Sequence, residues 1–374
     1  MRRCSVVAIF NWPPMARCQL VLLLLLCIAG AVLASGADGR KPIGVYELKK
    51  GNFSVKVTNL GAILMSVVLP DSKGNLADVV LGKTPSPNTL TILLTSDQWP
   101  AASRNGYPGA GSSSTAKSTT CTETTAGNTL HSGGRQFVKS IWEVKEYVCG
   151  GDSPYITLYH YSFDGEQGFP GAVDVYVTYR LSSPYTLGVH MNATALDKAT
   201  PVNLLSHTYW NLGGHGSGDV LGHTLKLFAS RHLVLDKELL PSSGRVEPVA
   251  GTPLDFRTPT PIGARIRQAS GGQVVGYDAN FIVDGEGMRP VAVARDGASG
   301  RALELWANQA TVQVYTANWL NNTKGKDGKV YNQYAGFTLE TMGYVDAVNH
   351  PEFPSQTLRP GQKYKHDMVL KFSF

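Results

Sequence analysis

Four polar residues have side chains that could carry out proton-transfer chemistry: His131, His207, Asp255 and Glu340. Glu340 is the most unusual of them, because it lies in the apolar segment 336–343, which is predicted to be a strand. A carboxylate is costly to bury unless it is paired or its pKa rises. A raised pKa would suit a general base that works near neutral pH, whereas the alternative is a buried ion pair with a structural role.

His207 lies in the segment 201–215, which is predicted to be a strand that runs into a Gly-Gly turn. Side chains alternate across a strand, so His207 is expected to face the same way as Asn203, Leu205 and Tyr209. An imidazole beside an aromatic ring, just before a turn, fits the acid of a sugar site. This segment alone favours the alternative, a histidine satisfied by hydrogen bonds in the core.

His131 and Asp255 lie in segments that are typical of turns. His131 is in the glycine-rich stretch 128–134, where a backbone without Cβ atoms can approach a ligand closely. The alternative is that this histidine has only a structural role in the turn. Asp255, within residues 252–257, is either a binding carboxylate or an ordinary aspartate in a turn or near a helix start. Neither residue indicates a site by itself.

The elements that must position these residues are almost all strands. Short segments with period-two alternation recur between turn signals, which predicts an all-β fold, a large antiparallel β-sandwich. Helical periodicity is confined to a short segment, residues 262–268. The predicted strands, besides those already named, are residues 43–48, 53–61, 62–69, 78–82, 141–148, 155–163, 172–181, 186–194, 224–229, 232–236, 281–283, 291–295, 302–306 and 312–316.

Length and composition indicate a globular protein. The chain has 374 residues, of which 43% are hydrophobic and 17% charged. This length permits two domains, but a large β-sandwich can form one, and we expect a single domain over residues 38–374. The net charge of +6 is spread along the chain without a Lys/Arg-rich run, so no nucleic-acid partner is expected.

The first 37 residues are predicted to be a secretory signal peptide. Arginines precede the apolar run 20–33, which is too short for a comfortable membrane span and is followed by small residues. The alternative is an uncleaved signal anchor. We therefore expect a secreted, extracellular protein with no membrane contact after cleavage. Three Asn-x-Ser/Thr sequons, at Asn52, Asn192 and Asn321, fit a secreted glycoprotein.

Cysteine usage is consistent with secretion. Two cysteines, Cys121 and Cys149, follow the signal peptide, and one disulfide between them is possible. The Cys and His spacings do not resemble a zinc site, so neither a metal nor another cofactor is expected.

The segment 84–126 differs from the rest of the chain. It is rich in serine and threonine, carries few charges and is interrupted by proline and glycine. By composition it is a low-complexity, loop-like segment. A loop of this length is unusual inside a compact domain.

The chain as a whole resembles the aldose 1-epimerase (galactose mutarotase) family. Each matching stretch is weakly specific alone, but together they run in family order over nearly all of residues 41–374. The stretches are residues 128–134, 164–171, 206–215, 252–256, 276–281, 312–316, 337–341, 346–351 and 358–364.

This resemblance implies a β-sandwich with an open sugar cleft and the interconversion of α and β anomers of free aldohexoses such as glucose and galactose. Glu340 matches the catalytic base that takes the proton of the anomeric hydroxyl, and His207 matches the acid that protonates the ring oxygen. His131, Asp255 and Gln313 match positions that bind sugar hydroxyls. The reaction needs no metal. We expect a monomer whose only partner is the aldose.

Two departures from the family pattern are visible. A serine follows His131 where members usually have Leu-His-Gly-Gly, and the segment 84–126 does not resemble the stretch that supplies an arginine to the sugar site. Loss of such a charge-assisted donor typically costs about 1.5–3 kcal/mol. The abrupt loss and recovery of the match motivate the hypothesis of two compensating frameshifts in the coding sequence or of an error in the gene model.

Two other functions are compatible with the same residues. A hexose-6-phosphate 1-epimerase would need a phosphate site, but the chain has no obvious cluster of arginines and carries a predicted secretory signal. A non-catalytic carbohydrate-binding relic would explain the missing arginine. The presence of both Glu340 and His207 argues against this second alternative.

Overall fold

The computed structural model describes residues 42–83, 137–235, 243–269 and 275–374. In these ranges the protein is built from antiparallel strands and four short 3-10 helices, which confirms the predicted all-β class. The predicted signal peptide, the Ser/Thr-rich segment 84–126, Cys121 and His131 lie outside the described residues. Cys149, the other cysteine after the signal, is disulfide-bonded.

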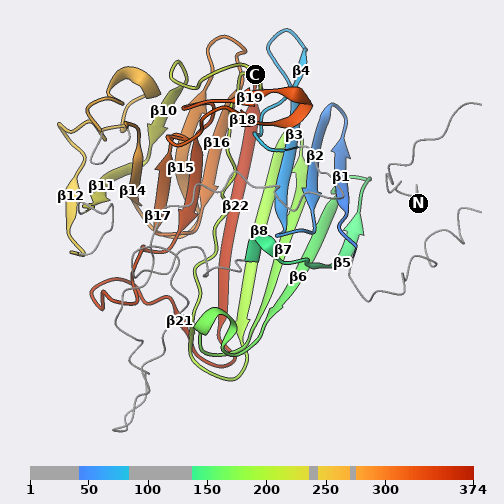
Figure 1. Ribbon diagram of the computed structural model, residues 1–374, viewed down its shortest axis with the longest axis vertical. Coiled ribbons are helices and arrows are strands. Elements are labelled where there is room, and N and C mark those ends of the chain that lie inside the picture. The colour runs from blue at the N-terminus through green and yellow to red at the C-terminus, as the bar shows by residue number, and fades with distance from the viewer. Residues whose placement is uncertain (1–41, 84–136, 236–242, 270–274) are drawn as a thin grey trace, which may run out of the picture.

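The largest sheet has nine strands, and β22 lies near its middle (Figure 1). Its strands, in spatial order, are β13 (Thr260–Pro261), β10 (Thr224–Leu227), β15 (Arg289–Arg295), β16 (Ala302–Ala307), β22 (Lys363–Ser373), β8 (Thr186–Ala195), β7 (Val173–Ser183), β6 (Tyr155–Ser162) and β5 (Glu143–Val148).

Two smaller sheets complete the core, and one of them carries Glu340. The five-stranded sheet has the order β12 (Val246–Pro248), β11 (Ala229–Leu233), β14 (Asp278–Val283), β17 (Thr311–Tyr315) and β20 (Thr338–Met342). The four-stranded sheet has the order β1 (Val45–Lys50), β2 (Phe53–Thr58), β3 (Ile63–Pro70) and β4 (Leu76–Asp78). The short pairs are β18 (Thr323–Lys324) with β19 (Val330–Tyr331), and β9 (Thr200–Pro201) with β21 (Thr357–Leu358).

The core forms because strands of these sheets bury one face. In β7, every second residue is buried, from Val173 through Val175 and Val177 to Leu181. This period-two pattern is what the sequence predicted for a half-buried strand. Removing such a side chain from water contributes about 1.5–3 kcal/mol, so one continuous cluster built from several sheets supplies most of the driving force.

Strand β22 is the main element that the sequence analysis did not predict. Its buried residues are His366, Met368, Leu370 and Phe372, and the intervening positions include several lysines. The lysines lie at exposed positions, so the alternation is intact over Met368, Leu370 and Phe372, and only the buried His366 departs from the apolar pattern. The position of β22 between β16 and β8 makes this strand part of the core scaffold.

Three predicted elements are shorter than expected. Most of the segment 201–209 is not a strand, since only Thr200–Pro201 pairs as β9 and Trp210 forms isolated bridges. The segment 78–82 contains the end of β4 and one bridge at Val80. The predicted helix over 262–268 is reduced to a 3-10 turn, Ile262–Ala264. Hydrogen bonds to distant segments, such as those from the amides of Ile262 to His223 and of Leu81 to Tyr209, fix the backbone there, and sequence periodicity does not report them.

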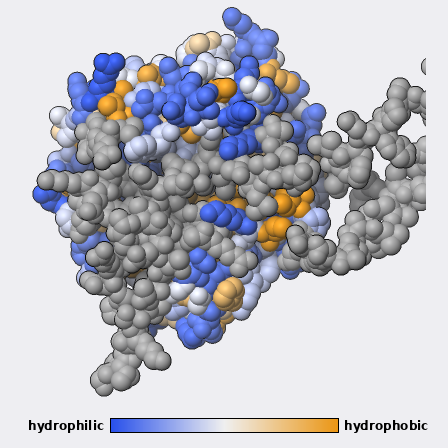
Figure 2. All heavy atoms as spheres, in the orientation of Figure 1, coloured by the Kyte–Doolittle hydropathy of each residue, from blue (hydrophilic) through white to orange (hydrophobic). Residues whose placement is uncertain are grey.

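The described surface is mostly hydrophilic on the face that Figure 2 shows, and hydrophobic side chains form small patches there. Within the described ranges, no helix is both long and apolar enough to cross a membrane.

Candidate active site

Glu340 lies at the centre of β20, a strand whose five residues are all buried. Its neighbours across the five-stranded sheet are polar, because Gln313 of β17 pairs with Glu340 and Asn280 of β14 pairs with Gln313. Residues paired in register point to the same face of a sheet. The three side chains therefore form a row across β14, β17 and β20, and each is at most 5% exposed.

The predicted acid and base lie together. Nε2 of His207 is 3.4 Å from Oε1 of Glu340, and the same carboxylate oxygen accepts a 2.7 Å hydrogen bond from the hydroxyl of Thr338. Burial lowers the pKa of His207 to about 4, so its imidazole is neutral at pH 7. A carboxylate and an imidazole at this distance can exchange a proton after a small movement.

The segment that carries His207 is tied to the end of the strand that carries Glu340. Oδ1 of Asn203 accepts a 3.0 Å hydrogen bond from the amide of Gly343, and its Nδ2 donates to the carbonyl of Gly343 at 3.4 Å. The ring of Tyr209 packs against the imidazole of His207 with a centroid distance of 5.1 Å. These contacts limit how far the two chain segments can move apart.

Gln313 is held by a carboxylate that the sequence analysis did not single out. Its Nε2 donates a 2.8 Å hydrogen bond to Oδ1 of Asp278. Asp278 and Asn280 are two residues apart on β14, so both point to the face that carries Gln313 and Glu340. Two polar residues on one face of an otherwise apolar strand were the signal in the sequence that could have identified Asp278.

Asp255 takes part in a different arrangement. Its carboxylate forms a two-bond pair with Arg257, at 2.9 Å from Nε to Oδ1 and 2.8 Å from Nη2 to Oδ2. This pair lowers the pKa of Asp255 to about 2. The guanidinium of Arg265 donates to the backbone carbonyl of Asp255 and so holds the turn. Its predicted role in binding a sugar stays a prediction.

Trp210 packs in the core. It is 3% exposed, and its ring lies 5.7 Å from that of Phe372 on β22. Tyr209 belongs to a separate small cluster with Leu81, Tyr315 and other buried residues, adjacent to His207. The two neighbouring aromatic residues therefore point to different sides, one to the core and one to the site.

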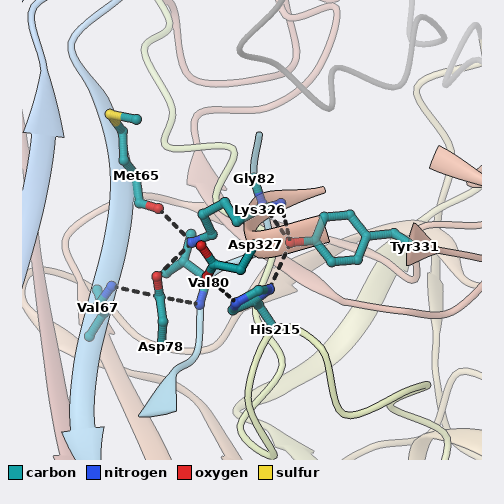
Figure 3. Close-up of polar contacts among 9 residues, drawn as sticks. All are labelled: Met65, Val67, Asp78, Val80, Gly82, His215, Lys326, Asp327 and Tyr331. Atoms are coloured by element: carbon teal, nitrogen blue, oxygen red, sulfur yellow. Dashed lines mark hydrogen bonds and ion pairs between the residues drawn. The ribbon is translucent and has the colours of Figure 1, made fainter. Parts of the chain in front are cut away.

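A second polar cluster, the Lys326 cluster, consists of Asp78, His215, Lys326, Tyr331 and the exposed Asp327 (Figure 3). Nζ of Lys326 lies 2.6 Å from Oδ2 of Asp78, and Nδ1 of His215 lies 2.9 Å from the hydroxyl of Tyr331. Nε2 of His215 is 3.4 Å from the carboxylate of Asp327. The cluster joins the end of β4 to the loops that follow His207 and β18.

Asp78 is hydrogen-bonded at both of its oxygens. Oδ1 accepts hydrogen bonds from the amides of Val67 and Val80, both at 3.1 Å, and Lys326 also donates to the carbonyl of Met65 at 2.9 Å. Burial lowers the pKa of Lys326, while the charge of Asp78 opposes this shift. These contacts indicate an anchor for the chain up to Gly82. Within the described ranges, His, Cys, Asp and Glu side chains do not gather in groups of three that could hold a metal ion.

Comparisons with known proteins agree with this architecture. The family described as aldose 1-epimerase matches residues 44–371. The galactose mutarotase of Mus musculus is 33% identical over 350 residues, which are 90% of this chain and 96% of that protein. The aldose 1-epimerase of Escherichia coli (strain K12) is 30% identical over 321 residues, 83% of this chain and 89% of the relative.

Among solved structures, the aldose epimerase homologue from C. elegans superposes with a TM-score of 0.76 at 23% identity. The match covers 89% of this chain and 99% of that one. The galactose 1-epimerase from Lactobacillus acidophilus gives a TM-score of 0.72 at 24% identity, over 90% and 96% of the two chains. These two likenesses show the fold.

Proposed function

We propose that this chain, which belongs to the aldose 1-epimerase family, interconverts the α and β anomers of free aldohexoses with Glu340 as base and His207 as acid. Interconversion of aldose anomers is the activity that the family assigns to the chain. The observation that supports the two residue roles is the 3.4 Å separation of Nε2 of His207 and Oε1 of Glu340 on a buried polar face.

The reaction requires that one proton be removed from the sugar and one be added to it. Glu340 takes the proton of the hydroxyl on C1, the C1–O5 bond breaks with its electron pair moving to O5, and His207 gives O5 a proton. The product is the open-chain aldehyde. Rotation about the C1–C2 bond presents the other face of the aldehyde, and the same two transfers run in reverse to close the ring.

The protonation states of the pair suit this sequence. At pH 7 the neutral imidazole of His207 carries one N–H, since burial lowers its pKa to about 4. A neutral imidazole can serve as the electrophilic partner of a carboxylate base. The hydroxyl of Thr338 donates to Glu340 and keeps the carboxylate oriented. The imidazole that gives its N–H proton to O5 is left as an imidazolate beside the newly protonated Glu340. Ring closure returns both protons and restores both residues, so the pair needs no outside proton donor.

The substrate class follows from the relatives and from the polar row. The curated relatives include galactose mutarotases, so we extend galactose to this chain as a substrate. We add glucose because the family resemblance implies free aldohexoses. Gln313, held by Asp278, presents an amide beside Glu340 that can bind a sugar hydroxyl. His131 and Asp255 remain predicted hydroxyl-binding residues. The comparisons do not favour a hexose-6-phosphate epimerase or a binding relic.

We further propose that the protein is secreted, acts as a monomer and carries glycans. The proposal rests on the predicted signal peptide, residues 1–37, and on the three sequons. Asn52, Asn192 and Asn321 are all exposed, as an acceptor asparagine must be. Intact-mass measurement of the protein secreted from eukaryotic cells, before and after glycosidase treatment, tests this. An unchanged mass after treatment would contradict glycosylation.

Polarimetry of freshly dissolved α-D-glucose and α-D-galactose tests the proposed reaction. The wild-type protein should bring the rotation to equilibrium faster than the spontaneous reaction. We expect His207→Asn to lower the rate by about 10²-fold or more, the usual contribution of a general acid, while the melting temperature is retained. Sugar binding without acceleration by the wild type would instead indicate a binding module. An unchanged rate in His207→Asn would refute the acid role.

A further inference from the structure

A histidine on the far side of the sheet from Glu340 contacts both chain segments that carry the proposed acid and base. We propose that this residue, His366 of β22, is a positioning residue that sets the spacing between Glu340 and His207. The proposal rests on the roles proposed above for those two residues. It adds a residue that touches neither the sugar nor the reacting atoms.

One contact of His366 reaches the strand of the base. Its Nε2 lies 2.8 Å from Oγ1 of Thr341, the residue that follows Glu340 on β20. Successive side chains of a strand point to opposite faces, so Glu340 faces the site while Thr341 faces β22. Both His366 and Thr341 are 0% exposed. Because β20 and β22 belong to different sheets, this hydrogen bond joins the two sheets directly behind the base.

The other contact of His366 reaches the segment of the acid. Its Nδ1 lies 3.1 Å from the backbone carbonyl of Leu204, three residues before His207. The hydroxyl of Tyr364, also on β22, donates to the same carbonyl at 3.2 Å and accepts from the amide of Leu204 at 3.3 Å. The segment 202–209 forms no strand. Hydrogen bonds from side chains of β22, rather than pairing with a neighbouring strand, hold its backbone.

The hydrogen bonds of His366 favour one arrangement of the ring. The hydroxyl of Tyr364 also lies 3.5 Å from Nδ1, but it already donates to the carbonyl of Leu204. The carbonyl of Leu204 can only accept, so Nδ1 carries the hydrogen. In the neutral ring Nε2 then accepts from the hydroxyl of Thr341. Burial lowers the pKa of His366 to about 4, which keeps this neutral form at pH 7. A rigid ring with one donor and one acceptor holds its two partners at a set separation.

This separation matters because the chemistry depends on the distance between two side chains. Nε2 of His207 and Oε1 of Glu340 are 3.4 Å apart, and in the proposed reaction they act on the neighbouring oxygen atoms O5 and O1 of one sugar. A misplacement of about 1 Å can lower a catalytic rate by about 10²-fold. Thr341 is one residue from the base and Leu204 is three residues from the acid, so a change at His366 reaches both within a few bonds.

Two substitutions separate the contacts, because the amide of asparagine reaches about as far as Nδ1 and that of glutamine about as far as Nε2. His366→Asn can keep the bond to Leu204 and lose the bond to Thr341, whereas His366→Gln does the reverse. Thr341→Val removes the hydroxyl alone. For each variant, polarimetry should show a fall in kcat of about 10-fold to 10²-fold, with KM within about twofold of the wild type.

His190→Gln is the matched control. This histidine lies on the neighbouring strand β8, is half-exposed, and bonds to Asp367 at 2.7 Å, next to His366 in the chain. It contacts neither the Leu204 segment nor β20 through its described hydrogen bonds. Its kcat should equal that of the wild type. A fall in kcat equal to that of His366→Gln would show a general loss of sheet stability and would overturn the proposal.

A second readout keeps the proposal separate from the proposed function. The imidazole of His207, followed by NMR through a pH titration, should have a higher pKa in His366→Gln because its loosened segment admits water. An unchanged titration of His207, in a folded variant, would overturn the positioning role whether or not the protein turns over sugar. Failure of the wild type to accelerate mutarotation, with a shifted titration in the variant, would refute the proposed function alone.

Discussion

The Glu340–His207 pair and the Lys326 cluster each contain a carboxylate and a histidine in a largely buried setting, but different groups contact the carboxylates of Glu340 and Asp78. Asp78 of the Lys326 cluster accepts from an ammonium at 2.6 Å and from two backbone amides. The described contacts of Glu340 are with a hydroxyl and with an imidazole that is neutral at pH 7. The first arrangement suits an anchor and the second suits a proton acceptor.

This difference indicates that the Lys326 cluster stabilises the fold, whereas the Glu340–His207 pair takes part in the reaction. A buried ion pair that is fully hydrogen-bonded resists the loss of either partner, since the remaining charge is then unpaired. A base must instead gain and lose a proton without disturbing its surroundings. We therefore expect substitutions at the two places to separate stability from activity.

Glu340→Gln should have the largest effect on activity. The substitution keeps the shape and the hydrogen bond from Thr338 but removes the proton acceptor, so kcat should fall by about 10³-fold or more. The melting temperature should stay close to that of the wild type. Glu304→Gln, the same change on a partly exposed carboxylate of β16, should leave kcat unchanged. Retained turnover in Glu340→Gln would show that Glu340 is not the base of the reaction.

Lys326→Met should have the largest effect on stability. It leaves the carboxylate of Asp78 buried without its cation, and breaking a buried pair costs about 3–5 kcal/mol of unfolding free energy. Urea unfolding measures this loss, and kcat per folded molecule should be retained. Lys324→Met, two residues earlier and exposed, is the control and should unfold like the wild type. A stable Lys326→Met variant would show that the cluster is not an anchor.

The stability of the protein should fall as pH is lowered from about 6.5 towards 4. His207 and His366 each have a pKa lowered by burial to about 4, whereas the unfolded chain binds those protons near 6.5. The unfolded state thus binds more protons within this window, and the stability present above it is lost as pH falls. Urea titrations at several pH values measure the slope.

Replacing one of these histidines sharpens this prediction. In His366→Gln the loss of unfolding free energy between pH 6 and pH 5 should be smaller than in the wild type by about 1 kcal/mol. An identical slope in the two proteins would mean that His366 titrates normally in the folded state, which its burial opposes.

Asp327→Asn should have the smallest effect. Asp327 belongs to the Lys326 cluster, but its side chain is 78% exposed and it faces His215 at 3.4 Å. Exposed ion pairs contribute about 0–1 kcal/mol, so unfolding free energy and kcat should both stay near the wild-type values. A large loss of stability would show that solvent exposure does not determine how much a residue of this cluster contributes to the unfolding free energy.

Local patterns in the sequence were enough to predict much of the fold. Alternation predicted β7 and β8, and the apolar setting of Glu340 predicted a buried carboxylate on a strand. β22 was missed although its lysines occupy exposed positions and Met368, Leu370 and Phe372 alternate as buried residues, because the first buried position is the polar His366. Alternation also predicted a strand around His207, where hydrogen bonds from β22 hold an irregular segment instead.

The composition of the site was predictable only in part. Glu340, His207 and Gln313 were expected together, and the structure brings them together through the pairing of β17 with β20 and through one 3.4 Å contact. Asp278 was missed because its role depends on which strand lies beside β17. Such pairings between distant segments depend on the register of the whole sheet, which local periodicity does not contain.

The most direct test of the central claim is the exchange between α and β anomers of galactose at equilibrium, measured by NMR on wild type, Glu340→Gln and Lys326→Met in parallel. Normalised to folded protein, the wild type and Lys326→Met should exchange the anomers at the same rate. Glu340→Gln should fall to the spontaneous rate. Exchange retained in Glu340→Gln, or lost in folded Lys326→Met, would contradict the assignment of Glu340 to the reaction and of Lys326 to the fold.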